Sequence, residues 1–110
     1  MAVTTEPIGE DIVAFRLDGR LNMVSAPALR SAVVSALAEG RSKVVIDLAE
    51  VTFMDSAGLG ALIACLKTAR QVGGDVRISA PSEQVSMVLS LSNVDRILVP
   101  YESVEAAYRD

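Results

Sequence analysis

One segment in the middle of the chain, Lys43–Ala49, is β-branched and apolar on both faces except at Asp47. A strand that is apolar on both sides must be covered on both sides, a pattern typical of the interior of a parallel sheet with helices packed against it. We therefore expect this segment to lie in the middle of an α/β sheet. The carboxylate of Asp47 is expected to accept a hydrogen bond from nearby backbone.

Strand and helix patterns alternate along the rest of the chain. A hairpin is expected first, with strands Val3–Ile8 and Asp11–Leu17 joined at Gly9-Glu10 and the second strand ended by Asp18-Gly19. A helix follows from the N-cap Ser25 through Pro27 to Gly40, and the interior strand comes after it. Next are a helix from Asp55-Ser56 to Gly73-Gly74, a strand Asp75–Ser79 and a helix marked by Val85, Val88, Leu89 and Leu91. The last elements are a strand Arg96–Tyr101, with Pro100 at an edge or strand end, and a helix Glu102–Arg109. The order ββαβαβαβα predicts a single α/β domain over residues 1–110, with a mixed central sheet of about four to five strands and about four helices.

The composition argues against most enzyme chemistry. The 110 residues include no His and one Cys. The commonest general base and zinc ligand is therefore missing, and neither a disulfide framework nor a cysteine-rich metal cage can form. We expect no catalytic residue, no metal and no cofactor.

The charge and the apolar runs point to a protein as the partner. A formal net charge of −4 disfavours nucleic acid and anionic membranes, because both need clustered Lys and Arg. The longest uncharged apolar runs, 56–66 and 84–94, reach about half of the ~20 residues that span a bilayer, and Met1–Asp11 lacks the basic start of a signal peptide. We therefore expect a cytoplasmic protein.

Three motifs that suggest chemistry lack the residues that would complete them. Gly58-Leu59-Gly60 opens a helix after a strand, but Ile63 stands where a dinucleotide fingerprint needs its third Gly, and no Gly-Lys-Ser/Thr phosphate loop occurs. The favoured interpretation is that small residues let the start of the helix pass close to the sheet. Ser56 lacks the preceding Gly and the His partner of a nucleophile elbow. Cys65, inside an apolar helix, is expected to be a buried small hydrophobe.

Two interpretations are open for Asp55-Ser56, the pair before the second helix. In the first, Ser56 is the N-cap, and Asp55 is favourably placed at the positive end of the helix dipole. In the second, Ser56 is exposed and receives a phosphoryl group from another protein, because a helix N-terminus offers N–H groups to a phosphate. The phosphate would add roughly −1.5 to −2 charges beside Asp55 and repel an acidic partner surface.

Two consecutive runs, Val44–Leu48 and Val51–Gly60, closely resemble the signature of STAS domains, specifically of the free-standing bacterial anti-sigma factor antagonists. Leu17–Asn22 resembles the segment before the first helix of that family, and Val99–Ala107 resembles its last strand and helix. The resemblance therefore covers nearly the whole chain, and the Asp-Ser-x-Gly-Leu-Gly run is its most specific part.

This resemblance implies partner switching. In the family, an unphosphorylated antagonist binds an anti-sigma factor that is an ATP-dependent serine/threonine kinase, and a sigma factor is released. The kinase then phosphorylates the serine matching Ser56 and ends the interaction, and a metal-dependent serine phosphatase restores it. The base and the magnesium would belong to the kinase. The implied partner-binding residues are Asn22, Met23, Val24, Ser25, Asp55, Ser56, Ala57, Gly58 and Leu59.

Two positions depart from the family pattern. Ala57 stands where a second Ser or Thr is frequent, which removes a rival acceptor, and Asn22 stands where Asp is common, which is a candidate cause of a weaker contact to the kinase. If the preceding strands run parallel, the loop Asn22–Ser25 and Asp55-Ser56 emerge at the same sheet edge. Met23 and Val24 are then either exposed beside Ser56 or tucked under the first helix, and both alternatives are open.

The same sequence features are compatible with other functions. The chain could be a STAS scaffold or a subunit of a larger assembly, such as a stressosome or a lipid-transport complex, in which Ser56 is only a helix cap. A less favoured alternative is a small-ligand or nucleotide binder that uses the glycine turn. For Asp47, membership of an acidic rim beside Ser56 is the less favoured alternative to the backbone hydrogen bond.

Overall fold

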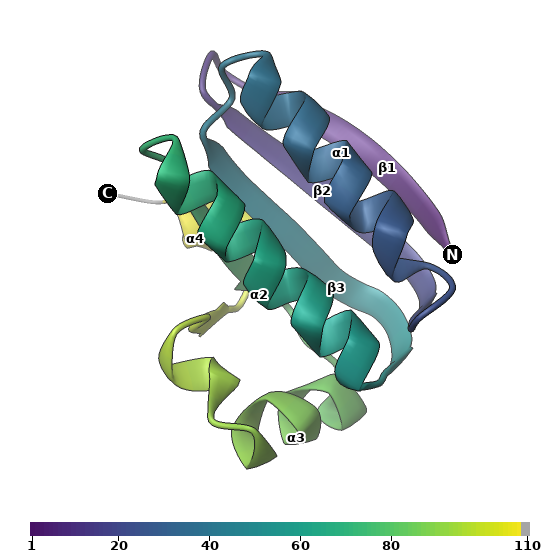
Figure 1. Cartoon of the computed structure of the whole chain (residues 1–110). Coiled ribbons are helices and arrows are strands. Elements are labelled where there is room, and N and C mark those ends of the chain that lie inside the picture. The colour runs from purple at the N-terminus through teal and green to yellow at the C-terminus, as the bar shows by residue number, and fades with distance from the viewer. Residues whose placement is uncertain (109–110) are drawn as a thin grey trace.

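A single mixed sheet organises the chain in the computed structural model, which describes residues 1–108 (Figure 1). Its elements are β1 (Ala2–Ile8), β2 (Ile12–Leu21), α1 (Ala26–Ala38), β3 (Lys43–Met54), α2 (Ser56–Gln71), β4 (Asp75–Ser79), α3 (Glu83–Leu91), a 3₁₀ turn (Val94–Arg96), β5 (Pro100–Tyr101) and α4 (Val104–Ala107). The strands lie in the order β1-β2-β3-β4-β5, with β1 antiparallel to β2 and every other neighbouring pair parallel. The predicted fold class and the order ββαβαβαβα are confirmed.

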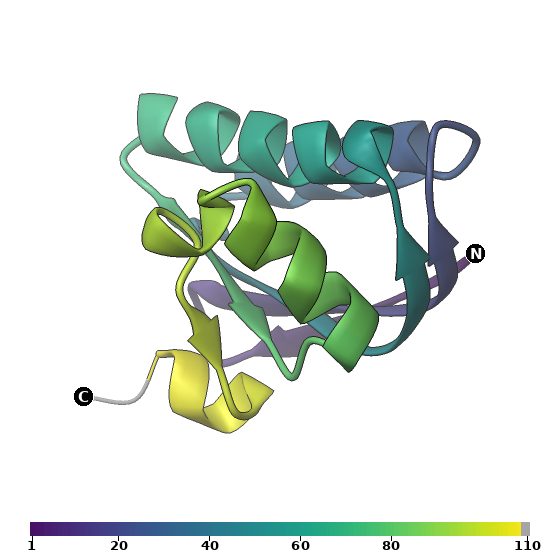
Figure 2. The same ribbon diagram turned by 90° about the horizontal axis from the view of Figure 1, so that it is seen from below.

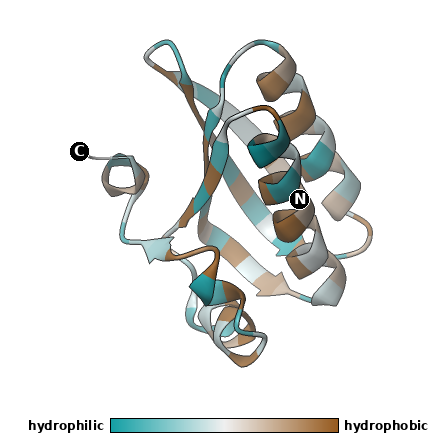
Figure 3. Cartoon of the chain, turned by 60° about the vertical axis from the view of Figure 1, so that its left-hand side comes forward, coloured by the Kyte–Doolittle hydropathy of each residue, from teal (hydrophilic) through white to brown (hydrophobic). Residues whose placement is uncertain are grey.

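The sheet separates two layers of helices. Helices α1 and α2 lie side by side on one face, and α4 lies on the other (Figure 2). Along β2 and β3 successive side chains point to opposite faces. Phe15 and Ile46 join the main core under α1 and α2, whereas Ala14 and Val45 pack with α4. The hydropathy colouring accordingly alternates along the strands (Figure 3). The expectation that Lys43–Ala49 is an interior strand is confirmed, since β3 is the central strand.

Strands β2 and β3 are longer than predicted. Asp18-Gly19 was expected to end the second strand, and Ala49 the third, but the pairing continues to Leu21 opposite Met54. Register shifts between Arg16 and Asp18 and between Gly19 and Arg20 absorb the break, and Gly19 takes a φ of 108° that favours glycine. This extension carries the ends of both strands beyond the rest of the sheet.

The C-terminal part contains less strand than predicted. Only Pro100–Tyr101 of the expected strand Arg96–Tyr101 pairs with β4, because Leu98 donates its N–H to the carbonyl of Val94 in a helical turn instead. The prediction that Pro100 lies in an edge strand is confirmed. The terminal helix, expected over Glu102–Arg109, is shorter and spans Val104–Ala107, and Arg109 lies outside the described residues.

The structure shows the surroundings of Asp47 and Cys65, which were both predicted from the sequence. The Asp47 carboxylate accepts from the backbone N–H of Ala49 at 3.0 Å, as expected, and also pairs with the guanidinium of Arg16 at 2.7 Å. This ion pair lies on the α4 side of the sheet, so Asp47 does not join an acidic rim at Ser56. Cys65 is buried, as predicted, and burial raises the pKa of its thiol to about 11 despite the opposing effect of Arg30.

Residues 1–108 contain neither a helix that could span a membrane nor a cluster of metal-binding side chains. None of their helices combines the length and the apolar character that crossing a bilayer requires. No three of their His, Cys, Asp or Glu side chains gather in a cluster that could hold a metal ion.

Candidate functional site

The ends of β2 and β3 bring two loops together at one edge of the sheet. Leu21 pairs in parallel with Met54, and the N–H of Asp55 donates to the carbonyl of Leu21 at 3.3 Å. The loop 22–25, which follows β2, therefore lies beside the start of α2, as expected for the carboxyl ends of parallel strands. These two segments form the candidate site.

Asp55, and not Ser56, is the N-cap of α2. Its backbone is extended, and its Oδ1 accepts from the N–H of Gly58 at 2.9 Å. Ser56 is the first residue of the helix and is exposed. The interpretation of Ser56 as a helix cap is therefore wrong by one position.

The hydroxyl of Ser56 has no structural task within the described part of the chain. It makes no hydrogen bond with any other residue from 1 to 108, in contrast with the serines that do cap helices here. Ser82 accepts from the N–H of Val85, and Ser103 accepts from the N–H of Ala106 at 3.1 Å. The hydroxyl of Ser56 is thus free to react with a group brought by another molecule.

The loop before α1 is held by the side chains of both Asn22 and Ser25. Ser25 has helical φ and ψ, and its hydroxyl donates to the carbonyl of Arg20 at 2.6 Å and accepts from the N–H of Asn22 at 2.9 Å. Ser25 occupies the N-cap position of α1, as predicted, but its side chain makes no capping hydrogen bond to the helix. Asn22 Oδ1 accepts from the N–H groups of Val24 and Ser25. A carboxylate oxygen of Asp could accept in the same way, so Asn22 retains the turn that an aspartate would make.

This loop presents apolar side chains to solvent. Met23 is 74% exposed and Val24 is 85% exposed. The open question of whether they tuck under α1 is answered, since both lie outside the core. Exposed Met and Val beside a free hydroxyl form a surface suited to contact with another protein.

The glycines at the start of α2 have different roles. A Cβ on Gly58 would lie well inside van der Waals contact of the carbonyl oxygen of Leu21, so this glycine lets the helix cross close to β2. That matches the packing interpretation. A Cβ on Gly60 would meet nothing within 4 Å, so the same interpretation is wrong for Gly60. Of the remaining predicted contacts, Ala57 is half-buried and Leu59 packs against the core, whereas Gly58 is buried.

One residue of the site was not predicted. β3 pairs with β4 only as far as Asp47 opposite Ser79, so its last residues have no strand on that side. Gln84 of α3 forms the hydrogen bonds that a neighbouring strand would otherwise form. The N–H of Met54 donates to Oε1 of Gln84 at 3.0 Å, and Nε2 of Gln84 donates to the carbonyl of Met54 at 3.2 Å. The side chain thereby fixes the residue directly before Asp55. No local sequence signal marks a contact across thirty positions.

Replacement of Gln84 by alanine should loosen this turn. Two hydrogen bonds to half-buried backbone are lost, which we expect to lower the free energy of unfolding by about 1–3 kcal/mol. Amide hydrogen exchange should accelerate at Met54 and Asp55, and Gln84→Glu should have an intermediate effect, because a carboxylate accepts from Met54 but cannot donate to it. Ser90→Ala, on the exposed side of α3, is the control. Unchanged exchange at Met54 in Gln84→Ala would contradict this role.

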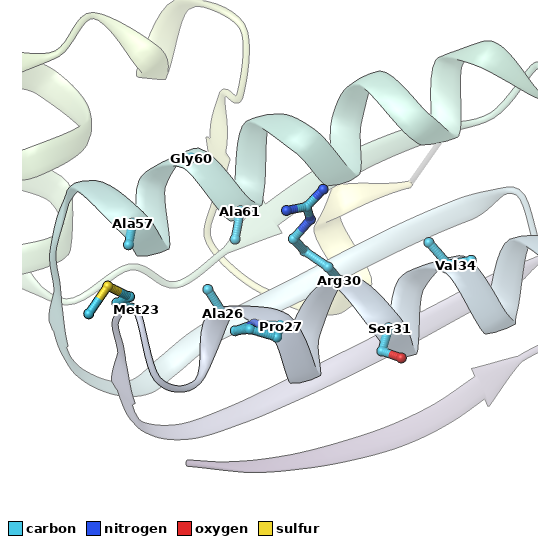
Figure 4. Close-up of a pocket in the computed structure, with 9 residues that line it drawn as sticks. All are labelled: Met23, Ala26, Pro27, Arg30, Ser31, Val34, Ala57, Gly60 and Ala61. Atoms are coloured by element: carbon cyan, nitrogen blue, oxygen red, sulfur yellow. The ribbon is translucent and has the colours of Figure 1, made fainter.

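A groove runs from this site between α1 and α2. It has a volume of about 760 Å³. The residues that line it are Met23, Ala26, Pro27, Arg30, Ser31, Val34, Ala57, Gly60 and Ala61 (Figure 4). Because Met23 and Ala57 belong to the two segments of the site, the groove and the site form one continuous surface.

Comparison with known proteins identifies related chains along nearly the full length. The sequence model of the STAS domain matches residues 4–107. A proposed anti-sigma factor antagonist of Thermotoga neapolitana is 33% identical over 104 residues, which cover 94% of this chain and 92% of that protein. The anti-sigma-B factor antagonist of Bacillus subtilis is 29% identical over 89 residues, 81% of each chain. The crystal structure of a proposed anti-sigma factor antagonist from Thermotoga maritima superposes with a TM-score of 0.86 at 29% identity, covering 97% of this chain and 95% of the other.

Proposed function

Because this chain belongs to the STAS domain family, we propose that it is an anti-sigma factor antagonist that is switched by phosphorylation of Ser56. Its unphosphorylated form binds an anti-sigma factor that is also a serine/threonine kinase, and a sigma factor is thereby released. Members of the family with this role are regulatory binding proteins and not enzymes. The chain acts in the cytoplasm, where its kinase and phosphatase partners also work.

The observation that carries this proposal is the free hydroxyl of Ser56. It stands exposed at the first position of α2, while Asp55 supplies the cap that the helix needs. Phosphorylation at this position therefore breaks no side-chain hydrogen bond among residues 1–108. The residues proposed to meet the partner are the exposed Met23 and Val24 together with the segment from Asp55 to Leu59.

In the proposed phosphoryl transfer, the ATP and the base belong to the kinase. The hydroxyl oxygen of Ser56 attacks the γ-phosphorus of ATP bound by the kinase, the bond from that phosphorus to the ADP oxygen breaks, and the hydroxyl proton passes to a base of the kinase. This chain supplies only the nucleophile. The phosphatase later transfers the phosphoryl group to water.

The added charge explains how binding ends. A phosphoserine carries roughly −1.5 to −2 charges at neutral pH. At Ser56 it would stand next to the Asp55 carboxylate and close to the apolar side chains of the loop 22–25. Burial of that charge against an apolar or acidic partner surface is unfavourable, so the complex dissociates.

Incubation with kinases tests the proposal directly. The purified chain and each anti-sigma factor kinase of its own genome are mixed with MgATP, and the mass of the chain is measured. We expect the addition of one phosphoryl group to the parent and none to Ser56→Ala, whereas the exposed control Ser90→Ala is modified like the parent. Failure of every kinase to modify the parent, or modification that persists in Ser56→Ala, would refute it.

A further inference from the structure

We propose that the groove between α1 and α2 receives a segment of the anti-sigma factor whose apolar side chains flank a carboxylate that pairs with Arg30. This inference rests on the proposed function and identifies the part of the partner that docks. Three features of the groove carry it: an unpaired cation, a glycine that the fold does not need, and continuity with Ser56.

Arg30 is the charged residue of the groove. Its guanidinium extends from α1 toward α2 (Figure 4). No carboxylate among residues 1–108 lies within ion-pair distance of it. The same holds for Arg20, Arg41, Lys67 and Arg96, but Arg30 is the one cation among the residues that line the groove. A lone cation in an otherwise uncharged groove is complementary to a carboxylate from outside.

Gly60 indicates how closely the occupant approaches. Glycine inside a helix costs about 1 kcal/mol relative to alanine. Gly60 has an ordinary helical backbone, and a Cβ placed on it would meet no atom within 4 Å from residues 1–108 other than its chain neighbours and the nearby backbone of its own helix. The fold therefore has no need of glycine at this position. A partner whose backbone or side chain comes into contact with α2 does need the space, because an added methyl group would hold it away.

The residues that line the groove indicate that the partner segment also carries apolar side chains, and the position of the groove indicates that the segment lies next to Ser56. Met23 and Val34 are 74% and 52% exposed, and Pro27 lies between them along α1. Apolar side chains of a partner would cover these three. Ala57, directly after Ser56, lies at the end of the groove, so a segment seated there holds its protein next to the hydroxyl.

The experiment measures affinity and stability on the same variants. The probe is the anti-sigma factor kinase that phosphorylates the parent chain, and dissociation constants are measured by calorimetry without ATP. We expect Arg30→Glu to weaken binding about 100-fold, because a carboxylate then faces a carboxylate, and Arg30→Gln to weaken it about tenfold. The charge-reversal control is Arg96→Glu in the exposed 3₁₀ turn after α3, which should bind like the parent.

Gly60→Ala separates docking from folding. We expect this variant to raise Tm by about 4 °C through helix propensity and yet to bind about tenfold more weakly. Ser90→Ala is the matched control, since it also places alanine on an exposed helical position but lies on α3. It should not change binding.

The outcomes distinguish this inference from the proposed function. If the parent binds its kinase and Arg30→Glu and Gly60→Ala bind equally well, the groove proposal is wrong and the antagonist function stands. If the parent binds none of the kinases, the function is wrong and the groove proposal falls with it. Weaker binding by both variants, with parent affinity in both controls, would support the groove.

Discussion

Gly58→Ala is expected to lower the free energy of unfolding by about 3 kcal/mol, a large part of the total stability of a domain of this size. The new methyl group would overlap the carbonyl of Leu21, and backbone cannot rotate away as the end of a flexible side chain can. The helix would have to move from β2, which would also strain the hydrogen bond from the N–H of Gly58 to Asp55. Urea denaturation followed by circular dichroism measures the change.

Gly60→Ala is the matched comparison for this prediction. The two glycines lie on the same helix two residues apart, and helix propensity favours alanine at both. Of these two positions, only Gly58 is one where an added methyl group would overlap the backbone of another element. The two substitutions should therefore shift the unfolding midpoint in opposite directions. A stability of Gly58→Ala equal to that of the parent would show that α2 does not cross β2 as closely as described.

Ser56→Glu is expected to weaken binding of the anti-sigma factor kinase about 100-fold, because a negative charge next to Asp55 must be buried against the partner. The fold should keep the stability of the parent, since Ser56 is exposed and its hydroxyl supports no other described residue. Calorimetric titration of the kinase into each variant gives the affinities, and thermal unfolding gives the stabilities.

Ser56→Gln separates charge from size in that experiment. Glutamine has nearly the shape of glutamate without its charge, so this variant should bind within about tenfold of the parent. If Gln and Glu weaken binding equally, the side chain acts by its size, and the electrostatic account of switching is incorrect.

The order of strands and helices along the chain, and the interior place of the strand that begins at Lys43, could be predicted because their signals are local. The β-branched run Lys43–Ala49 and the apolar spacing of the helix after Ser56 follow from side-chain periodicity alone. The parallel arrangement then placed the loop 22–25 next to the start of α2. These inferences needed no knowledge of distant contacts.

The features that were mispredicted depend on single positions or on distant partners. Asp55 and Ser56 are both good N-caps, and only the backbone angles decide that Asp55 is the cap. Gln84 reaches Met54 from another element, which periodicity cannot reveal. The different roles of Gly58 and Gly60 depend on where the carbonyl of Leu21 lies, although the residues are identical in sequence terms.

Under the proposed function, the cap of α2 by Asp55 has a consequence for the lifetime of the chain in the cell. Cellular proteases degrade chains in proportion to how often they unfold, so a modification that weakened the fold would also shorten the lifetime of the chain. Modification of Ser56 breaks no bond within the described fold, because the helix is capped one residue earlier. Under the proposed function, phosphorylation of Ser56 would therefore leave the lifetime of the chain unchanged, and dephosphorylation would return the same molecule to the form that binds the partner.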